Sequence, residues 1–512
     1  MLWTLAGALH AGFSALCVAL VAAFLLLVCT PVLHQPVRSR LRPLALQEVE
    51  QGLSWVLAAQ RWQTPLLTSL FMHSSHSVSV TFYASFLPML FWLGLPELGR
   101  DLVLLMTLSL FVGNAIKDLV CSPRPLGLAY GRQRLKFLAA DSSDEEVQLN
   151  AKEYGLPSSH TLNSLCLNYF AVWYFYDRGL IASGTALALY GLVALWVVWI
   201  AASRLYLGLH TPVDILAGAL AGLAVLVCFI AVEGLLSRWI LHGPAAVLHA
   251  ALASLVLLRL HPRPMAHTPS FEFTTSFMGA MFGVVAGMAL TPQAHQPGVQ
   301  LAQLWSGAGS RLAGSRLLWA LRRLGVGFAA VAVMKEGSKP LLLALLPLLY
   351  RFFPLPIRRL WQPPVHNLAA APPAAAAKQH SAQQVQEEQQ AKQRQPRNAR
   401  QHADGDSAND EALLDRHNGG RQHGMRTRRS AAAAAAAAAD QAGGSKQAGQ
   451  AAAATSGLPG ALPPQDLRLA ELPHDAQGRP WDVVVTARFF SYAAIGVAVA
   501  GVAPRLLDAL GW

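Results

Sequence analysis

Long apolar runs constrain this chain more strongly than any other feature of its sequence. A transmembrane helix needs about 20 consecutive, mostly apolar residues, and several segments reach that length. Lipid offers the backbone no hydrogen-bond partners, so such a run has to fold as a helix. Only 13% of the residues are charged and 53% are hydrophobic, whereas soluble domains carry about 25% charged residues. The sequence therefore predicts an all-α, polytopic helical membrane protein.

The apolar runs also divide the chain into regions. We expect spans at 5–33, 68–95, 100–117, 160–177, 181–202, 212–236, 240–260, 273–290, 324–350 and 483–507. No basic segment precedes the first run, which favours a retained anchor over a cleaved signal peptide. The regions are a hydrophobic anchor with a basic linker (1–63), a core that carries polar motifs (64–240), additional helices (241–360), a low-complexity insertion (361–482) and a terminal helix (483–512). The insertion is rich in Gln, Ala and Arg and lacks apolar periodicity, so we predict that it is disordered.

The formal net charge of +12 is not a nucleic-acid signature. Much of the positive excess lies outside the apolar runs, in 311–323, 351–360 and the insertion. No basic stripe is interleaved with aromatic residues. We therefore assign this charge to membrane surfaces and to the insertion, and expect membrane lipids rather than nucleic acid as partners.

Three short polar strings stand at the ends of predicted spans. They are Lys117–Pro125, Pro157–His160 and Ser203–Asp214. Counting the spans between them places all three on one face of the membrane. Ionisable residues at the ends of spans are costly and mark functional sites by default.

The strings contain the groups that bind a phosphoryl group. Lys117, Arg124 and Arg204 supply fixed positive charge, and the guanidinium fork of arginine holds two oxygens at once. Ser158 and Ser159 add hydrogen-bond donors at the start of a predicted helix, where free N–H groups favour anions. For a single cation, snorkelling from a span end would be the simpler interpretation.

Two histidines and a carboxylate complete the set. His160 and His210 are the candidates for general acid and nucleophile. Asp214 can accept a hydrogen bond from His210 and fix its tautomer. Thr211-Pro212-Val213-Asp214 also reads as a helix start with a capping carboxylate, and the two roles are compatible. We expect no metal and no other cofactor, because three cations already neutralise a phosphate and the acidic loop residues 141–146 have no partner histidines.

Together the strings resemble the signature of the type-2 phosphatidic acid phosphatase superfamily, K-x6-R-P, P-S-G-H and S-R-x5-H-x3-D. Every spacing is met, and the one departure is Ser159 in place of the glycine. With a hydroxyl residue at this position, the chain resembles the sphingosine-1-phosphate phosphatase subfamily. The segments Glu153–Gly155, Thr268–Phe277 and Arg488–Tyr492 also look like that subfamily.

This resemblance implies a core of six helices with extra transmembrane helices. It implies a metal-independent phosphatase that hydrolyses sphingoid long-chain base 1-phosphates. In that scheme His210 forms a phosphohistidine, Asp214 orients it, and His160 protonates the leaving group and then activates water. The remaining residues would hold the phosphoryl oxygens: Lys117, Arg124, Ser158, Ser159 and Arg204.

The resemblance further implies an endoplasmic reticulum membrane with a lumenal site. Span counting places several arginines opposite the motifs, which agrees with the positive-inside rule: Arg100, Arg178, Arg238, Arg311, Arg316, Arg322 and Arg323. Arg38, Arg40 and Arg42 disagree, because the same counting places them on the motif face.

Other functions stay open at this stage. The same strings would serve a broader phosphatase for phosphatidate or isoprenoid diphosphates, or a lipid phosphotransferase that uses an alcohol in place of water. A transporter is disfavoured, because its ionisable residues would lie mid-span in related halves of the chain.

Overall fold

The computed structural model describes residues 2–128, 135–136, 153–243, 245–291, 313–353 and 479–510. Every regular element in these ranges is helical, so the all-α prediction is confirmed for the described part of the chain. Most of the predicted insertion and the acidic residues 141–146 lie outside the described residues. The division into five regions therefore stays a prediction.

Seven helical segments are long and apolar enough to cross a membrane among the residues described. They lie in α1 (Leu2–Val28), α5 (Pro96–Val120), α9 (Ser183–Tyr206), α10 (Pro212–His242), α12 (Ser270–Leu290), α14 (Ala313–Leu349), and α18 (Trp481–Val497) continued through η5 (Ala498–Val502) and α19 (Ala503–Ala509). Two other predicted spans correspond to α8 (Ser159–Asp177) and the shorter α11 (Ala246–Leu260). The chain is a multi-pass helical membrane protein.

The predicted span 68–95 is wrong as a single helix. The structure divides it into α3 (Pro65–His76) and α4 (Val80–Trp92). Ser79 caps α4, because its hydroxyl accepts a hydrogen bond from the backbone N–H of Phe82 at 3.0 Å. Serine side chains form hydrogen bonds with nearby backbone groups and therefore favour helix ends. The hydropathy averaged over residues 68–95 does not reveal this effect of a single serine.

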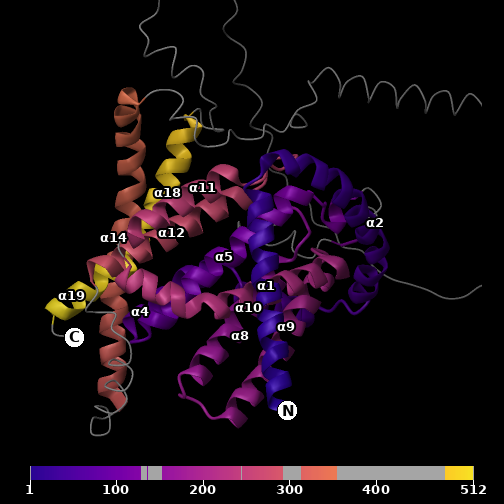
Figure 1. Ribbon diagram of the computed structural model, residues 1–512, viewed down its shortest axis with the longest axis horizontal. Helices are drawn as coiled ribbons and strands as arrows, with labels where there is room; N and C mark the ends of the chain where they lie inside the picture. The colour runs from indigo at the N-terminus through magenta and orange to yellow at the C-terminus, as the bar shows by residue number, and fades with distance from the viewer. Residues whose placement is uncertain are drawn as a thin grey trace, which may run out of the picture. The chain divides into compact units, whose positions relative to one another are not determined.

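Helix α5 lies at the centre of the bundle (Figure 1). It packs against α4, α8, α10 and α12, and nearly all of its residues are buried. A helix that is covered on every side belongs inside a bundle rather than against lipid. Its C-terminal turn, which ends at Val120, therefore delivers Lys117 to a protein interior.

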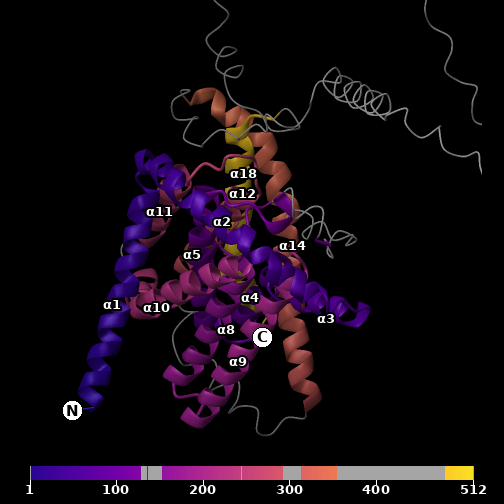
Figure 2. The same ribbon diagram turned by 90° about the vertical axis from the view of Figure 1, so that its right-hand side faces the viewer.

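Helix α12 packs closely against α18, as Figure 2 shows from the side. A Cβ at Gly283 would lie 2.0 Å from the carbonyl oxygen of Ala493, and one at Gly279 would lie 2.3 Å from that of Phe489. Small residues allow this approach of two backbones in a membrane. The terminal helix is thereby joined to the core.

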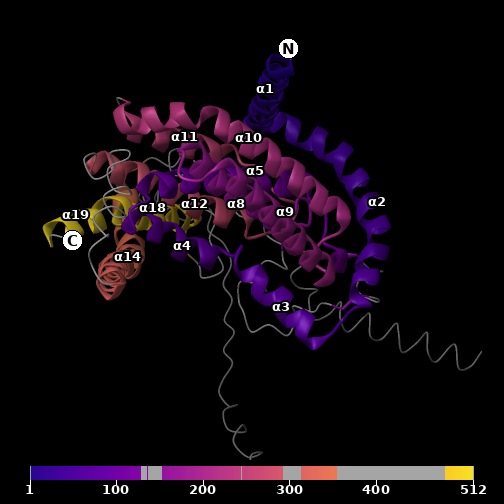
Figure 3. The same ribbon diagram turned by 90° about the horizontal axis from the view of Figure 1, so that it is seen from below.

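Helix α2 (His34–Gln60) crosses the end of the bundle at which α5 ends and α8 begins, called the motif end below (Figure 3). Nε of Arg38 donates to the carbonyl of Leu119 at 2.8 Å, and Nη2 donates to that of Asp118 at 2.8 Å. Nε of Arg42 donates to the carbonyl of Cys121 at 3.2 Å. These arginines satisfy the last carbonyls of α5. Arg38, Arg40 and Arg42 all belong to this helix, so they lie at the motif end, as span counting predicted. Arg38 and Arg42 are bound to backbone carbonyls there.

Candidate active site

One pocket at the motif end brings together side chains from all three polar strings. It is lined by Lys117 at the end of α5, Arg124 in the following loop, Ser159 and His160 at the start of α8, Arg204 in the last turn of α9, and His210 in the loop before α10. The same pocket has an apolar wall formed by Val78, Tyr83, Leu110, Leu209 and Phe273. A cationic pocket beside an apolar wall suits an amphiphilic anion.

Backbone hydrogen bonds hold the three strings in register. The N–H of Gly155 donates to the carbonyl of Ser122 at 2.8 Å, and the N–H of Ser158 donates to the carbonyl of Asp214 at 2.9 Å. Helix α10 approaches the second contact closely, because a Cβ at Gly218 would lie 2.6 Å from the carbonyl oxygen of Ser158. The start of α8 is therefore fixed to the start of α10.

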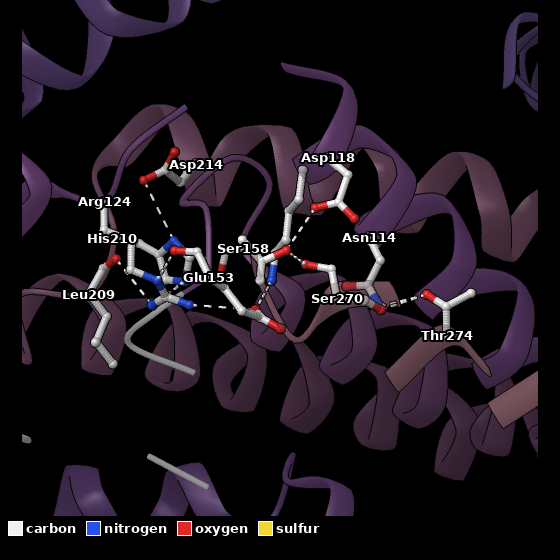
Figure 4. A network of polar contacts seen from close by, with 12 residues as sticks. Asn114, Asp118, Arg124, Glu153, Ser158, Leu209, His210, Asp214, Ser270 and Thr274 are labelled. Atoms are coloured by element: carbon white, nitrogen blue, oxygen red, sulfur yellow. Dashed lines mark hydrogen bonds and ion pairs between the residues drawn. The ribbon is translucent and has the colours of Figure 1, made fainter. Parts of the chain in front are cut away.

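Arg124 is held at three points around the pocket (Figure 4). Its Nε donates to the carbonyl of Glu153 at 3.1 Å and its Nη1 to that of Leu209 at 3.4 Å. Nη1 also lies 3.5 Å from Nε2 of His210. A guanidinium has no acceptor, so this contact favours a neutral ring whose Nε2 keeps its lone pair.

His210 and Asp214 face each other behind the pocket (Figure 4). Nδ1 of His210 lies 3.6 Å from Oδ2 of Asp214, longer than a hydrogen bond. Oδ2 instead accepts from the backbone N–H of Thr211 at 2.8 Å and from its hydroxyl at 3.1 Å, so the predicted capping role is present. Burial lowers the pKa of His210 well below 6.5, and the nearby cations Arg124 and Lys117 lower it further.

Ser158 occupies a different place from the one predicted. Its buried hydroxyl is the N-cap of α8, where it accepts from the N–H of Thr161 at 3.5 Å and from the Thr161 hydroxyl at 3.1 Å. It is not among the residues that line the pocket. Ser159 does line it, and its buried hydroxyl has no hydrogen-bond partner among the described residues. The first serine therefore caps α8, and the second is the one that lines the pocket.

Two partners of the predicted cations were missed by sequence reasoning. Glu153 forms a buried ion pair with Lys117, and its carboxylate lies 3.7 Å from Nη2 of Arg124. Ser75, on α3, accepts a hydrogen bond from Nη2 of Arg204. Both partners lie outside the three strings, and the only sequence signal for either is the resemblance of Glu153–Gly155 to the sphingosine-1-phosphate phosphatase subfamily.

Asp118 turns away from the pocket toward α12 (Figure 4). Oδ1 accepts from the hydroxyl of Thr268 at 3.1 Å, and Oδ2 lies 3.7 Å from Nδ1 of His261. Within the described ranges, no group of three His, Cys, Asp or Glu side chains is arranged to hold a metal ion. Asp118 therefore belongs to a contact between α5 and the start of α12.

Comparison with known proteins identifies the family. The PAP2 superfamily model matches residues 98–236, which enclose all three strings. A lipid phosphate phosphatase delta of Arabidopsis thaliana is 34% identical over 63% of this chain and 74% of its own length. The chain belongs to the PAP2 superfamily.

Other similar proteins are named as phosphatases of sphingoid base phosphates. A dihydrosphingosine 1-phosphate phosphatase of Saccharomyces cerevisiae is 29% identical over 57% of this chain and 68% of its own length. A probable sphingosine-1-phosphate phosphatase of Dictyostelium discoideum is 25% identical over 59% and 74%. No solved structure matches the chain. This PAP2 protein is a lipid phosphatase, and sphingoid phosphate phosphatases are among its relatives.

Proposed function

We propose that this PAP2 protein hydrolyses sphingoid long-chain base 1-phosphates through a phosphohistidine at His210. The convergence of Lys117, Arg124, Arg204 and two histidines on one pocket with an apolar wall carries the proposal. The sphingoid substrate is supported by the printed names of the yeast and Dictyostelium relatives. The Arabidopsis relative is named as a lipid phosphate phosphatase, with no sphingoid lipid in its name, which favours a broader substrate range as the second candidate.

In the first step, Nε2 of His210 attacks phosphorus and the bond from phosphorus to the lipid oxygen breaks. His160 enters this step protonated, because the dianionic phosphoryl group of the bound substrate favours its charged form, and it gives that proton to the leaving alkoxide, so a free long-chain base departs. Lys117, Arg124, Arg204 and Ser159 bind the phosphoryl oxygens, whose charge they neutralise in the transition state. The lone pair on Nε2 that this step needs is supported by the contact with Arg124 and by the lowered pKa of His210.

In the second step, water attacks the phosphohistidine. His160, now neutral, takes a proton from the water as general base. The nitrogen–phosphorus bond breaks, inorganic phosphate leaves, and both histidines return to their starting states. Asp214, whose Oδ2 lies 3.6 Å from Nδ1 of His210 in the empty pocket, moves closer as positive charge develops on the ring and stabilises the Nδ1–H, as the carboxylate of a catalytic triad does.

The test is phosphate release from dihydrosphingosine 1-phosphate and from phosphatidate, by membranes that carry wild type or His210→Ala, with excess chelator. Selective release from the sphingoid lipid that the substitution abolishes and the chelator leaves unchanged would support reaction and substrate class together. Equal release from both lipids would favour the broader phosphatase. Wild-type turnover by His210→Ala would overturn the phosphohistidine scheme.

We also propose that the protein resides in the endoplasmic reticulum with its pocket on the lumenal side. Arg38 and Arg42 bind the carbonyls at the end of α5 and keep their positive charge there, so this orientation rests on the arginines at the opposite end of the bundle. At the other end Arg238 is exposed. Arg311 and the side chain of Arg316 lie outside the described part of the chain.

A further inference from the structure

Glu153 places a negative charge inside a pocket that binds an anion. Its side chain is buried, lines the pocket, and pairs with Lys117. Nη2 of Arg124 lies 3.7 Å from the same carboxylate oxygen, and Nε of Arg124 donates to the Glu153 carbonyl at 3.1 Å. The residue is therefore fixed among the cations that would hold the phosphate.

A carboxylate at this position opposes the binding of a simple phosphate monoester. The phosphoryl group of such an ester carries about two negative charges at neutral pH, and it competes with Glu153 for Lys117 and Arg124. Once these cations turn to the phosphate, the Glu153 carboxylate is left buried without a partner. An uncompensated buried charge is strongly unfavourable. A pocket for phosphate alone would bind better without this residue.

A substrate that brings its own cation removes this conflict. A sphingoid base 1-phosphate carries a primary ammonium on the carbon next to the one that bears the phosphate. When its phosphoryl group takes over Lys117 and Arg124, the ammonium can take their place beside Glu153. Every charge in the pocket then keeps an opposite partner.

We propose that Glu153 binds the ammonium of the substrate and makes the enzyme selective for amine-bearing phosphate monoesters. This inference rests on the proposed function and deepens it, since it names the group that distinguishes the substrate from phosphatidate. Glu153 then plays two roles in turn. It is the counter-ion of Lys117 in the empty pocket and the partner of the ammonium in the complex.

The test compares two lipids that differ only in the amine: dihydrosphingosine 1-phosphate and its N-acetyl derivative. For the wild type, kcat/KM should favour the free amine by on the order of 10- to 100-fold, the range expected for a hydrogen bond to a charged group. Glu153→Gln should abolish most of this preference, mainly by raising KM for the free amine. Its kcat/KM for the N-acetyl lipid should be unchanged or higher.

Glu272→Gln is the matched control, because Glu272 pairs with Arg488 on α18 and does not line the pocket. It should keep the wild-type preference. If Glu153→Gln does not yield a folded protein in detergent, Glu153→Asp decides. Aspartate keeps a negative charge near Lys117, but its side chain is one methylene shorter, so the carboxylate lies farther from the substrate ammonium. The preference for the free amine should therefore fall several-fold.

The outcomes separate the inference from the proposed function. Retention of the wild-type preference by the folded Glu153 variant would overturn the inference alone. Equal hydrolysis of the two sphingoid lipids by the wild type would do the same, and the sphingoid phosphatase activity would stand. Hydrolysis of phosphatidate but of neither sphingoid lipid would overturn both.

Discussion

Oδ2 of Asp214 lies 3.6 Å from Nδ1 of His210 while it accepts hydrogen bonds from the backbone N–H and hydroxyl of Thr211. One carboxylate therefore both caps α10 and faces the proposed nucleophile. The other oxygen, Oδ1, has no hydrogen-bond partner among the described residues. Catalytic hydrogen bonds are often long in empty enzymes and shorten in the substrate complex, so the two roles can be separated only by substitution.

Asp214→Asn should separate them. The amide oxygen can still accept from Thr211, so the cap and the thermal stability should be largely kept. The amide cannot stabilise a positive charge on His210, so kcat should fall by about 10²- to 10⁴-fold. Asp214→Ala should in addition lose about 0.5–2 kcal/mol of stability with the cap. Near wild-type kcat for Asp214→Asn would leave Asp214 with a capping role only.

Arg124→Gln should change both the rate and its pH dependence. Loss of one donor to the transition state lowers kcat/KM by on the order of 10²–10³. The positive charge of Arg124 is one cause of the lowered pKa of His210, so its removal raises that pKa. His210 is then protonated, and inactive as a nucleophile, at a higher pH than in the wild type. The acidic limb of the pH profile of kcat/KM should shift upward.

Arg238→Gln is the control for this profile. Arg238 is exposed on α10, where its Nε donates to the carbonyl of Gly234, and it does not line the pocket. Its removal should leave both the rate and the acidic limb in place. If the acidic limb of the kcat/KM profile does not shift in Arg124→Gln, a group other than His210 controls it.

Gly218→Ala should disturb the pocket through α8. The new Cβ would lie 2.6 Å from the carbonyl oxygen of Ser158, so α8 and α10 must move apart, which displaces Ser159 and His160 relative to His210. We expect a large loss of activity. Gly234→Ala, on the same helix, meets nothing within 4 Å and should gain up to about 1 kcal/mol from the better helix propensity of alanine. Thermal unfolding in detergent and phosphate release measure the pair, and equal activities would show that the α8–α10 contact does not position the pocket.

Arg38→Gln should destabilise the motif end. Arg38 donates to the carbonyls of Asp118, Leu119 and Arg263, and glutamine lacks the charge and the fork to replace it. The loss should be about 1.5–3 kcal/mol, the value of a hydrogen bond from a charged group. Activity should also fall, because Lys117 is in the turn of α5 that these bonds secure. Arg40→Gln, at an exposed position on the same helix, should leave both quantities unchanged.

Orientation can be measured with introduced glycosylation sites. An acceptor placed in residues 140–150, which follow the first motif, should be modified in microsomes if the pocket is lumenal. An acceptor placed between α12 and α14 should stay unmodified, because span counting assigns that segment to the opposite face. The reverse pattern would place the pocket in the cytosol.

The sequence alone determined the helical membrane class and the polar residues of the three strings. Both are local properties. A run of apolar residues has one way to satisfy its backbone in lipid, and the spacing from Lys117 to Arg124 or from His210 to Asp214 lies within one helix end or one loop. Counting the spans also placed the three strings on one face of the membrane, and this required no knowledge of packing.

Only the tertiary structure decided which groups these residues face. Glu153 reaches Lys117 and Ser75 reaches Arg204 from segments distant in the chain, and no periodicity encodes such pairs. The roles of Ser158 and Ser159 separate because a helix has one N-cap, and the backbone path into α8 selects the first serine. Two other features have a common cause with these: the break between α3 and α4, and the binding of Arg38 to the end of α5. Side chains and backbone groups buried together must satisfy one another, and packing determines which of them meet.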